Sequence, residues 1–152
     1  MCWTCDHPDA TEEDTLDVYR AIVRRRGYAL CAVEAEGDLP WLVHTVGLTG
    51  EGLPELVVTG APAEVAAALL DDVAEHCILD GVPAPGQRLV TGTGTTVELV
   101  EVHRPEAHLH VATALFARVR AVQLVWPDAR GRYPWASGDR SRQPVLGPRA
   151  RR

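Results

Sequence analysis

The sequence predicts an α+β fold, in which a mixed or antiparallel central sheet of about five to six strands packs with about three helices in a single domain. Three observations predict it. Short runs rich in β-branched residues follow one another across tight turns, two long stretches place apolar residues at helical spacing, and the chain of 152 residues has the length of one domain. We expect residues 1–128 to form this domain and residues 129–152, rich in Arg, Pro and Gly, to form a tail.

The stretch 41–62, WLVHTVGLTGEGLPELVVTGAP, is the centre of the predicted sheet. Two apolar runs flank the turn-forming TGEG, which predicts a hairpin. Both runs are apolar at nearly every position and do not alternate with polar residues, a pattern typical of strands covered on both faces.

A polar lead, residues 1–10, precedes the first predicted helix. Thr11 is a good N-cap, and Asp14 stands at the capping-box position among acids that suit the start of a helix. Three arginines suit its other end, and Gly27 terminates it. Residues 28–35, YALCAVEA, then predict the first strand.

A long Ala-rich helix is predicted at 63–80, between Pro62 in its first turn and Gly81 after its last. The remaining chain alternates turn signals with shorter periodic runs. These runs predict strands at 87–92, 95–103 and 119–126 and a helix at 106–117. The predicted order is therefore α-β-β-β-α-β-β-α-β.

Charge is distributed unevenly along the chain. Residues 129–152 contain seven arginines and one acid, whereas residues 1–128 carry a net charge of −12. An acidic body repels phosphate, which argues against nucleic-acid binding, and we expect the basic tail to pack on its own body or on that of a partner copy in a homo-oligomer. The absence of lysine among 15 basic residues is typical of a high-GC bacterial source.

The start of the chain predicts the cellular compartment. It has neither the basic beginning nor the apolar centre of a signal peptide, and no run approaches the roughly 18 apolar residues of a membrane span. We therefore expect a cytoplasmic protein that does not bind membranes. In that compartment the four cysteines are expected to be thiols or metal ligands.

The lead carries Cys2, Cys5 and His7 at a spacing that lets two thiolates and an imidazole face one ion, the ligand set that zinc prefers. A fourth ligand would come from elsewhere in the chain. The same residues are also consistent with a terminus bearing unligated thiols. A third hypothesis is a thiol redox site, although no strand precedes the CxxC; a fourth is a nucleophilic N-terminal cysteine exposed by removal of Met1. The candidates for the fourth zinc ligand are Cys31, His44, Cys77 and the histidines at 103–110.

Histidines are dense at 103–110. His103 and Glu106, at the predicted helix start, can share a divalent ion, whereas His108 and His110 diverge if 106–117 is helical. The alternative is a set of solvated polar residues in which Glu106 complements the helix dipole. His44 differs, because it interrupts a buried run; it is either a hydrogen-bonded core residue or part of a pocket wall.

The end of the last predicted strand, QLVWPDARGRYPW, alternates aromatic and arginine side chains. Such residues form ligand walls and oligomer contacts, and they also pin a tail across a sheet. We expect a pocket or dimer face built by Trp41, His44, Trp126, Arg130, Tyr133 and Trp135.

Three stretches, MCWTCDHPD, HTVGLTGEGLPELVVTG and VRAVQLVWPDARGRYPW, together with the final QPVLG, resemble a bacterial and especially actinobacterial family, domain of unknown function 4262. The resemblance covers nearly the whole chain and implies no activity, so it assigns no catalytic residue. Where relatives often have an aromatic residue in YTVGL, this chain has His44, which argues against an obligatory catalytic role for that histidine.

The leading functional hypothesis is an accessory module that binds a small molecule or protein partner through the hairpin and the aromatic–arginine loop. The first alternative is a metal-dependent enzyme or zinc-stabilised domain that uses the N-terminal CxxCxH. The second alternative is a thiol redox protein. Beyond zinc, no cofactor is predicted.

Overall fold

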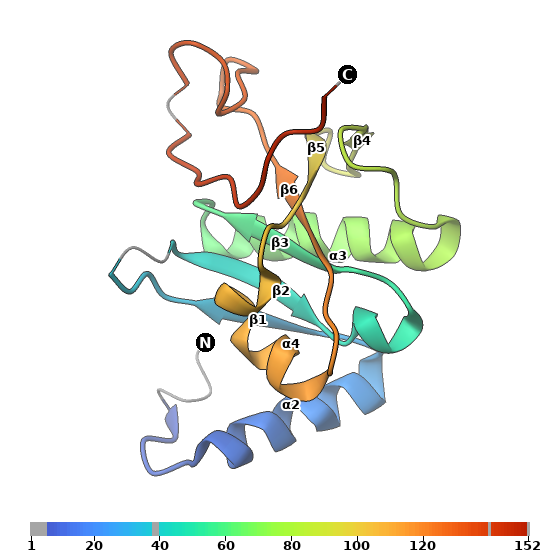
Figure 1. Ribbon diagram of the computed structural model, residues 1–152, viewed down its shortest axis with the longest axis vertical. Helices are drawn as coiled ribbons and strands as arrows, with labels where there is room; N and C mark the ends of the chain where they lie inside the picture. The colour runs from blue at the N-terminus through green and yellow to red at the C-terminus, as the bar shows by residue number, and fades with distance from the viewer. Residues whose placement is uncertain (1–5, 38–39, 140, 152) are drawn as a thin grey trace.

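The computed structural model describes residues 6–37, 40–139 and 141–151 (Figure 1). Its helices are α2 (Glu12–Arg26), α3 (Ala63–Asp80) and α4 (His110–Leu115), with short 3₁₀ turns η1 (Leu48–Glu51) and η2 (Pro105–Ala107). Its strands are β1 (Ala29–Val33), β2 (Leu42–Val46), β3 (Glu55–Thr59), β4 (Arg88–Val90), β5 (Thr96–Glu101) and β6 (Ala121–Val125).

The six strands form one sheet in the order β1-β2-β3-β6-β5-β4. Strands β3 and β6 run parallel, and every other neighbouring pair is antiparallel. Over the residues that the structure describes, this mixed sheet packs with three helices in a single domain, which confirms the predicted α+β fold. Across the described ranges, none of the helices is long and apolar enough to cross a membrane.

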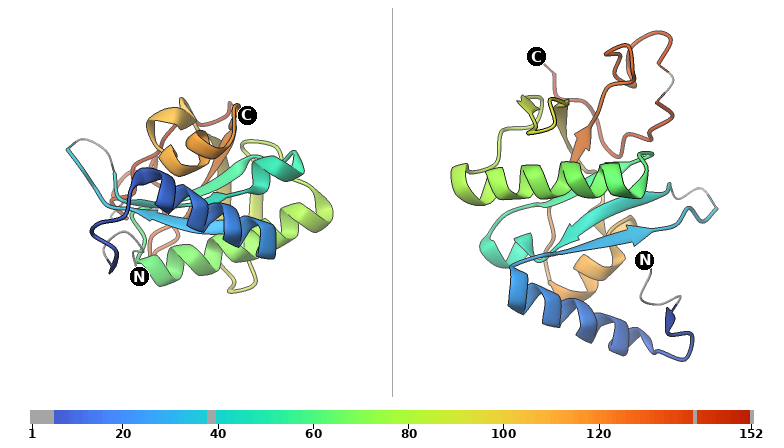
Figure 2. Two further views of the ribbon diagram at one scale, coloured as in Figure 1. Left: turned by 90° about the horizontal axis from the view of Figure 1, so that it is seen from below. Right: turned by 180° about the vertical axis from the view of Figure 1, so that it is seen from behind.

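The sheet is covered on both faces, as Figures 1 and 2 show. Helix α3 packs on one face through a buried stripe that includes Leu70 and Val73. Helices α2 and α4 pack on the other face, against Leu42 and Val46 of β2. Successive strand residues point to opposite faces and both faces are covered, so every residue of β2 is buried. This explains why the strand is apolar at every position except His44 and Thr45.

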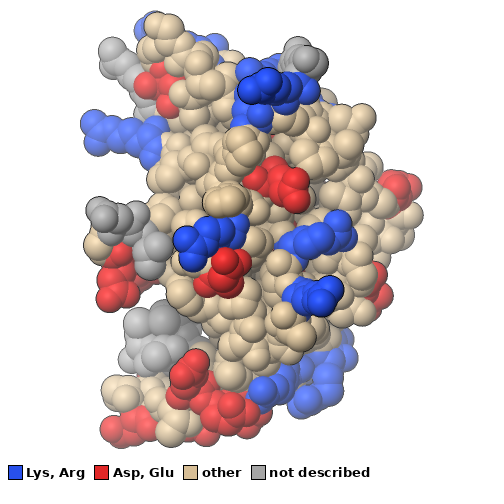
Figure 3. Space-filling model, in the orientation of Figure 1, with Lys and Arg blue, Asp and Glu red and all other residues tan. Residues whose placement is uncertain are grey.

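Local capping residues define helix α2. The Thr11 backbone N–H donates to the Asp14 carboxylate at 2.9 Å, and the Asp14 N–H donates to the Thr11 hydroxyl at 3.2 Å, so the predicted capping box is present. Acidic side chains crowd the first turn of the helix and arginines its last turn, which complements the helix dipole. In Figure 3, acidic side chains (red) gather at the lower left of the molecule and arginines (blue) at the lower right.

The last helix is shorter than the predicted 106–117. Arg104 has φ 54°, Pro105 opens the turn η2, and α4 begins only at His110. Leu109 between them has φ −103° and ψ 64° and is fully buried, so the chain breaks its helical course where this side chain enters the core.

A buried carboxylate holds the connection between β2 and β3. Glu55 has no solvent exposure, and one of its oxygens accepts hydrogen bonds from the Gly47 N–H at 2.8 Å and from the N–H and hydroxyl of Thr49 at 3.1 and 2.9 Å. The other oxygen accepts from the Thr45 hydroxyl at 2.6 Å and the Leu48 N–H at 3.3 Å. Donors that would otherwise be unpaired in the turn are thereby satisfied. The motif HTVGLTGEGLPE is thus accounted for by local structure.

The C-terminal segment crosses the sheet on the same face as α4. The Gln123 amide donates to the Pro144 carbonyl at 2.8 Å and accepts from the Leu146 N–H at 2.7 Å. The Thr59 hydroxyl also donates to Pro144, at 2.6 Å. This segment therefore contacts both strands of the parallel pair, and through Gln143 it also holds Trp126 at the start of the loop after β6.

Candidate functional site

The loop after β6 is a tight turn built on Asp128. Its carboxylate accepts from the backbone N–H groups of Arg130 and Arg132, both at 2.9 Å, and from the Arg132 Nε, also at 2.9 Å. The backbone hydrogen bond from Arg132, followed by that from Arg130 and the charge of Arg132, holds the pKa of the Asp128 carboxyl below its usual range despite opposing desolvation. Asp128 is therefore a structural anion that fixes where the two arginines project.

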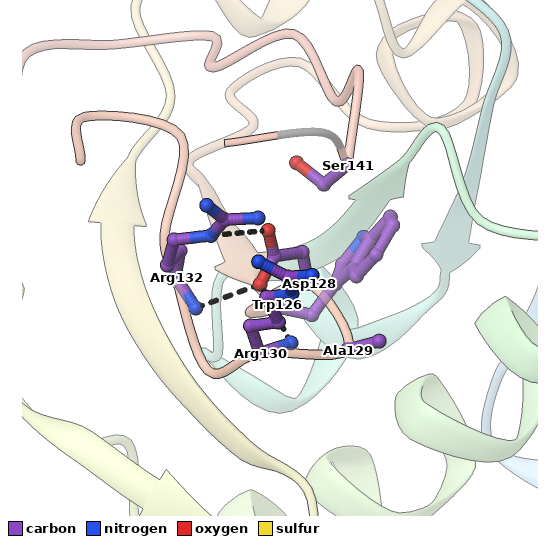
Figure 4. Close-up of a pocket in the computed structure, with 6 residues that line it drawn as sticks. All are labelled: Trp126, Asp128, Ala129, Arg130, Arg132 and Ser141. Carbon is purple, nitrogen blue, oxygen red and sulfur yellow. Dashed lines mark hydrogen bonds and ion pairs between the residues drawn. The ribbon is translucent and has the colours of Figure 1, made fainter. Parts of the chain in front are cut away.

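These arginines border a pocket of about 360 Å³, which we call the loop pocket (Figure 4). Trp126 forms one wall, and Ser141 approaches from the C-terminal segment. The Ser141 hydroxyl donates to the Asp139 carboxylate at 3.0 Å. The loop pocket is lined by Trp126, Asp128, Ala129, Arg130, Arg132 and Ser141.

The wall of the loop pocket is rigidly held. The Trp126 indole N–H donates to the Thr59 carbonyl at 3.0 Å, and its backbone N–H donates to the Gln143 side-chain oxygen at 3.1 Å. The Gln143 side chain donates in turn to the Trp126 carbonyl. Thr59 and Trp126 stand at the carboxyl ends of β3 and β6, so the pocket lies beyond the carboxyl ends of the parallel pair, where open α/β sheets bind ligands.

A second group of aromatic and arginine residues pins the C-terminal segment. The rings of Tyr133 and Trp135 stack at 5.4 Å, with Arg88 over the first and Arg149 over the second. Both arginines pair with the buried Glu98, at 3.2 Å from Arg88 Nε and 2.8 Å from Arg149 Nε. Burial alone raises the pKa of Glu98, but the hydrogen bonds and charges of the two arginines outweigh it, so this pKa lies below its usual value.

Comparison with known proteins matches a family model described as "Domain of unknown function (DUF4262)" to residues 22–140, more than half of the chain. The chain belongs to the DUF4262 family. Neither the curated proteins nor the solved structures contain a match. The resemblance stated from the three sequence stretches is thereby confirmed. Family membership carries no activity, so the roles of residues in this DUF4262 protein follow from geometry.

The six expected site residues of this DUF4262 protein occupy four places. Trp126 and Arg130 border the loop pocket, and Tyr133 and Trp135 stack in the neighbouring group. Trp41 packs against the cluster under α3, and its carbonyl accepts from Gly60 at 3.3 Å. The structure thus brings together Trp126 with Arg130 and Tyr133 with Trp135. The two remaining residues, Trp41 and His44, belong to neither pair.

His44 lies in the centre of the sheet with no solvent exposure. Its Nδ1 is 2.8 Å from the Thr45 carbonyl, which can only accept, so Nδ1 carries the hydrogen and Nε2 is an acceptor. Burial, opposed by this hydrogen bond and assisted by the charge of His110, lowers the pKa of His44 to about 4. Among the described residues, no group hydrogen-bonds to Nε2.

Those predicted metal ligands that the structure describes are not gathered into one group. Cys2 and Cys5 lie outside the described residues, and His7 lies in a surface pocket beside the N-terminal end of α2. His103 is exposed, and Glu106 is exposed and pairs with Arg104 at 3.4 Å. In the described ranges, no group of three or more His, Cys, Asp or Glu side chains is placed to hold a metal ion.

The expected set of site residues omitted several residues of the loop pocket and of the neighbouring group around Tyr133 and Trp135. Asp128 and Arg132 belong to the sequence motif, and the spacing of an Asp four residues before an Arg, with Gly131 between, is the local signal for the turn. Ser141 and Glu98 have no such signal, because they reach their partners only through the path of the C-terminal segment and the sheet.

Proposed function

We propose that this DUF4262 protein is a binding module that takes a small anionic ligand with a planar apolar part in the loop pocket. The observation that carries the proposal is the placement of two guanidinium groups beside a half-buried indole ring, at the carboxyl end of the parallel strand pair. Guanidinium forks match carboxylate and phosphate groups, and an indole face suits a planar ring.

The hydrogen bonds of the loop support this ligand class. Asp128 accepts from the Nε of the Arg132 side chain, and among the residues described in the structure no hydrogen bond or ion pair holds the other nitrogens of that guanidinium. Within the described residues, no hydrogen bond or ion pair holds the Arg130 guanidinium, which is exposed at the rim. The volume of about 360 Å³ lies near the lower end for small-molecule sites, which favours a compact ligand.

Titration with phenyl phosphate and with inorganic phosphate, followed by amide NMR shifts, tests the proposal. We expect phenyl phosphate to shift the resonances of the loop pocket and Arg130→Gln to weaken its binding at least about tenfold, equivalent to about 1.4 kcal/mol. Arg118→Gln is the matched control, because Arg118 is also exposed but lies outside the loop pocket. Equal binding by both variants, shifts confined to another region, or no shift at about 10 mM phenyl phosphate, a weak-binding limit, contradicts the proposal.

Zinc binding by Cys2, Cys5 and His7 with His44 is the second candidate function. The specific observation that favours it is the buried Nε2 of His44, since a histidine ligand usually donates its other ring N–H to a carbonyl or carboxylate. Thiolate and imidazole ligands would hold the ion tightly.

Metal analysis of protein purified without an affinity tag tests this second candidate. We expect about one zinc per chain in the wild type and a loss in a Cys2→Ser, Cys5→Ser variant. His44→Gln should reduce the zinc content, whereas His76→Gln, a histidine on the other face of the sheet, should not. Less than about 0.1 zinc per wild-type chain removes the candidate, since structural zinc sites bind tightly.

A further inference from the structure

A second pocket lies where the end of the C-terminal segment runs beside β5 (Figure 1). We call it the strand-end pocket. It is lined by Pro85 and by two stretches of chain, residues 101–104 and 148–151. Its volume of about 560 Å³ lies within the usual range for small-molecule sites. Of the described residues, none lines both this pocket and the loop pocket, so the two are separate places on the molecule.

The two stretches that line the strand-end pocket run in opposite directions. The His103 N–H donates to the Leu146 carbonyl at 2.8 Å, which places the start of the C-terminal stretch beside the end of the other. Farther along, a Cβ added at Gly86 would lie 2.9 Å from the Ala150 Cβ, and the Gly86 N–H donates to the Leu99 carbonyl at 2.7 Å. Leu146 therefore marks the His103 end of the pocket, and Ala150 marks the Leu99 end.

This antiparallel arrangement separates two arginines that line the pocket. Arg104 follows His103, and Arg151 follows Ala150, so the two arginines leave the chain at opposite ends. The ends are four residues apart along the strand and the turn after it, which is at most about 14 Å of chain. Glu101, the last residue of β5, lies between them. The strand-end pocket therefore has a guanidinium at each end and a carboxylate between the two.

The two end arginines keep donors for a ligand. The Nε of Arg104 is 3.4 Å from the Glu106 carboxylate, and both side chains are largely exposed. In the part of the chain that the structure describes, no hydrogen bond or ion pair holds the other nitrogens of Arg104 or the guanidinium of Arg151. Because an exposed ion pair contributes little stability, a ligand anion can replace Glu106 at little cost. Arg149 differs, since its guanidinium donates to Glu98 at 2.8 and 3.1 Å and forms a fixed part of the wall.

We propose that the strand-end pocket binds a compact ligand that carries an anionic group at each end and hydroxyl groups between them. Guanidinium groups at the two ends match carboxylate or phosphate groups, and the Glu101 carboxylate accepts hydrogen bonds from hydroxyl donors. A single small anion would engage only one end, and a dianion without hydroxyl groups would desolvate Glu101 without giving it a donor. This inference goes beyond the proposed function and does not depend on the loop pocket.

Two matched pairs of probes test the proposal by calorimetry. D-glucarate and adipate are six-carbon dicarboxylates that differ in their hydroxyl groups, and mannitol bisphosphate and hexanediol bisphosphate, phosphorylated at both ends, differ in the same way. We expect the hydroxylated member of at least one pair to bind at least about tenfold more tightly than its partner and than inorganic phosphate. The pair that binds identifies the anionic group as carboxylate or phosphate. In amide NMR spectra the shifts should fall on residues 101–104 and 148–151.

Variants then assign the roles of the lining residues. Arg104→Gln and Arg151→Gln should each weaken binding of the tightest probe at least about tenfold, with an unchanged circular dichroism spectrum. Glu101→Ala should reduce the preference for the hydroxylated member of the pair. Arg25→Gln is the matched control, because Arg25 is an exposed arginine at the end of α2, outside the pocket. Arg130→Gln, in the loop pocket, should also leave this binding unchanged, which separates this test from that of the proposed function.

Four results would overturn the proposal. The first is no binding of either hydroxylated probe at about 10 mM. The second is equal binding of both members of each pair, which would leave Glu101 without a role in recognition. The third is an equal loss of affinity in Arg25→Gln and in the two pocket arginine variants, which would indicate attraction by overall charge alone. The fourth is a set of amide shifts that omits residues 101–104 and 148–151.

Discussion

Replacing Glu55 tests the central claim about the hairpin, that a buried carboxylate holds the β2–β3 connection. The carboxylate accepts five hydrogen bonds, three from backbone N–H groups and two from hydroxyls. A hydrogen bond to a charged group contributes about 1.5–3 kcal/mol, and a buried donor left unpaired costs about 1–3 kcal/mol. In Glu55→Gln the amide NH₂ must face at least one backbone N–H, so one donor is orphaned and the others lose the charge of their acceptor.

We expect Glu55→Gln to lower the free energy of unfolding by about 3 kcal/mol and Glu55→Ala by about 5 kcal/mol. For a chain of this length the smaller loss corresponds to a fall of about 6–12 °C in the unfolding midpoint. Urea and thermal unfolding followed by circular dichroism measure both quantities. Glu51→Gln, an exposed glutamate in the same connection, should stay within about 0.5 kcal/mol of wild type. A Glu55→Gln variant within about 1 kcal/mol of wild type would refute the reasoning.

Three further predictions concern other buried contacts. Arg149 and Arg88 lower the pKa of Glu98 in the folded protein, so the ionised Glu98 should contribute fully to stability above about pH 4.5. This contribution should be lost as the pH falls through the folded-state pKa, and acid titrations of the free energy of unfolding should show no such loss in Glu98→Gln. The pKa of His44 is about 4 in the folded protein and about 6.5 in an unfolded chain, so between these pH values the unfolded chain binds more protons. The free energy of unfolding should therefore increase as the pH rises from about 4 to 6.5, and it should increase more in wild type than in His44→Gln. A Cβ at Gly147 would overlap the Glu101 carbonyl, so Gly147→Ala should unfold at lower urea than wild type, whereas Gly50→Ala, with ordinary contacts at its Cβ, should not.

The outcomes that would contradict these three predictions are distinct. An unchanged acid transition in Glu98→Gln would mean that its ion pairs contribute nothing to folding. A parallel pH dependence of wild type and His44→Gln would place the titration elsewhere. Equal stability of the two glycine variants would show that the C-terminal segment does not pack closely on β5.

Helix α2 and the β2–β3 hairpin were predictable because their determinants are close together in the sequence. Thr11 and Asp14 cap each other across three residues, and their hydrogen bonds form without any tertiary partner. Runs that are apolar at nearly every position predicted strands covered on both faces, and β2 and β3 are buried at every position. The start of the last helix was less predictable, because the burial of Leu109 is a tertiary requirement.

The candidate site was predictable only in part. Trp126 and Arg130 were expected to border a ligand site, and they border the same pocket because a local turn around Asp128 arranges them. His44 was expected either in a pocket wall or as a hydrogen-bonded core residue; its Nδ1 is hydrogen-bonded to Thr45 and its Nε2 has no partner within the described residues. No pattern in the sequence identifies Ser141 as a neighbour of Trp126, fifteen residues earlier.

By itself, the sequence determined the α+β class, the main helices, the buried hairpin and membership in the DUF4262 family, since each depends on local periodicity, capping or motif. The tertiary structure alone decided that β6 inserts parallel to β3. It also decided that Glu98 collects Arg88 and Arg149 and that the C-terminal segment completes the loop pocket. These features join residues that are far apart in the sequence, such as Thr59 and Pro144, which are 85 positions apart. Such contacts form only when the free energy gained by packing the sheet offsets the entropy lost in closing long loops.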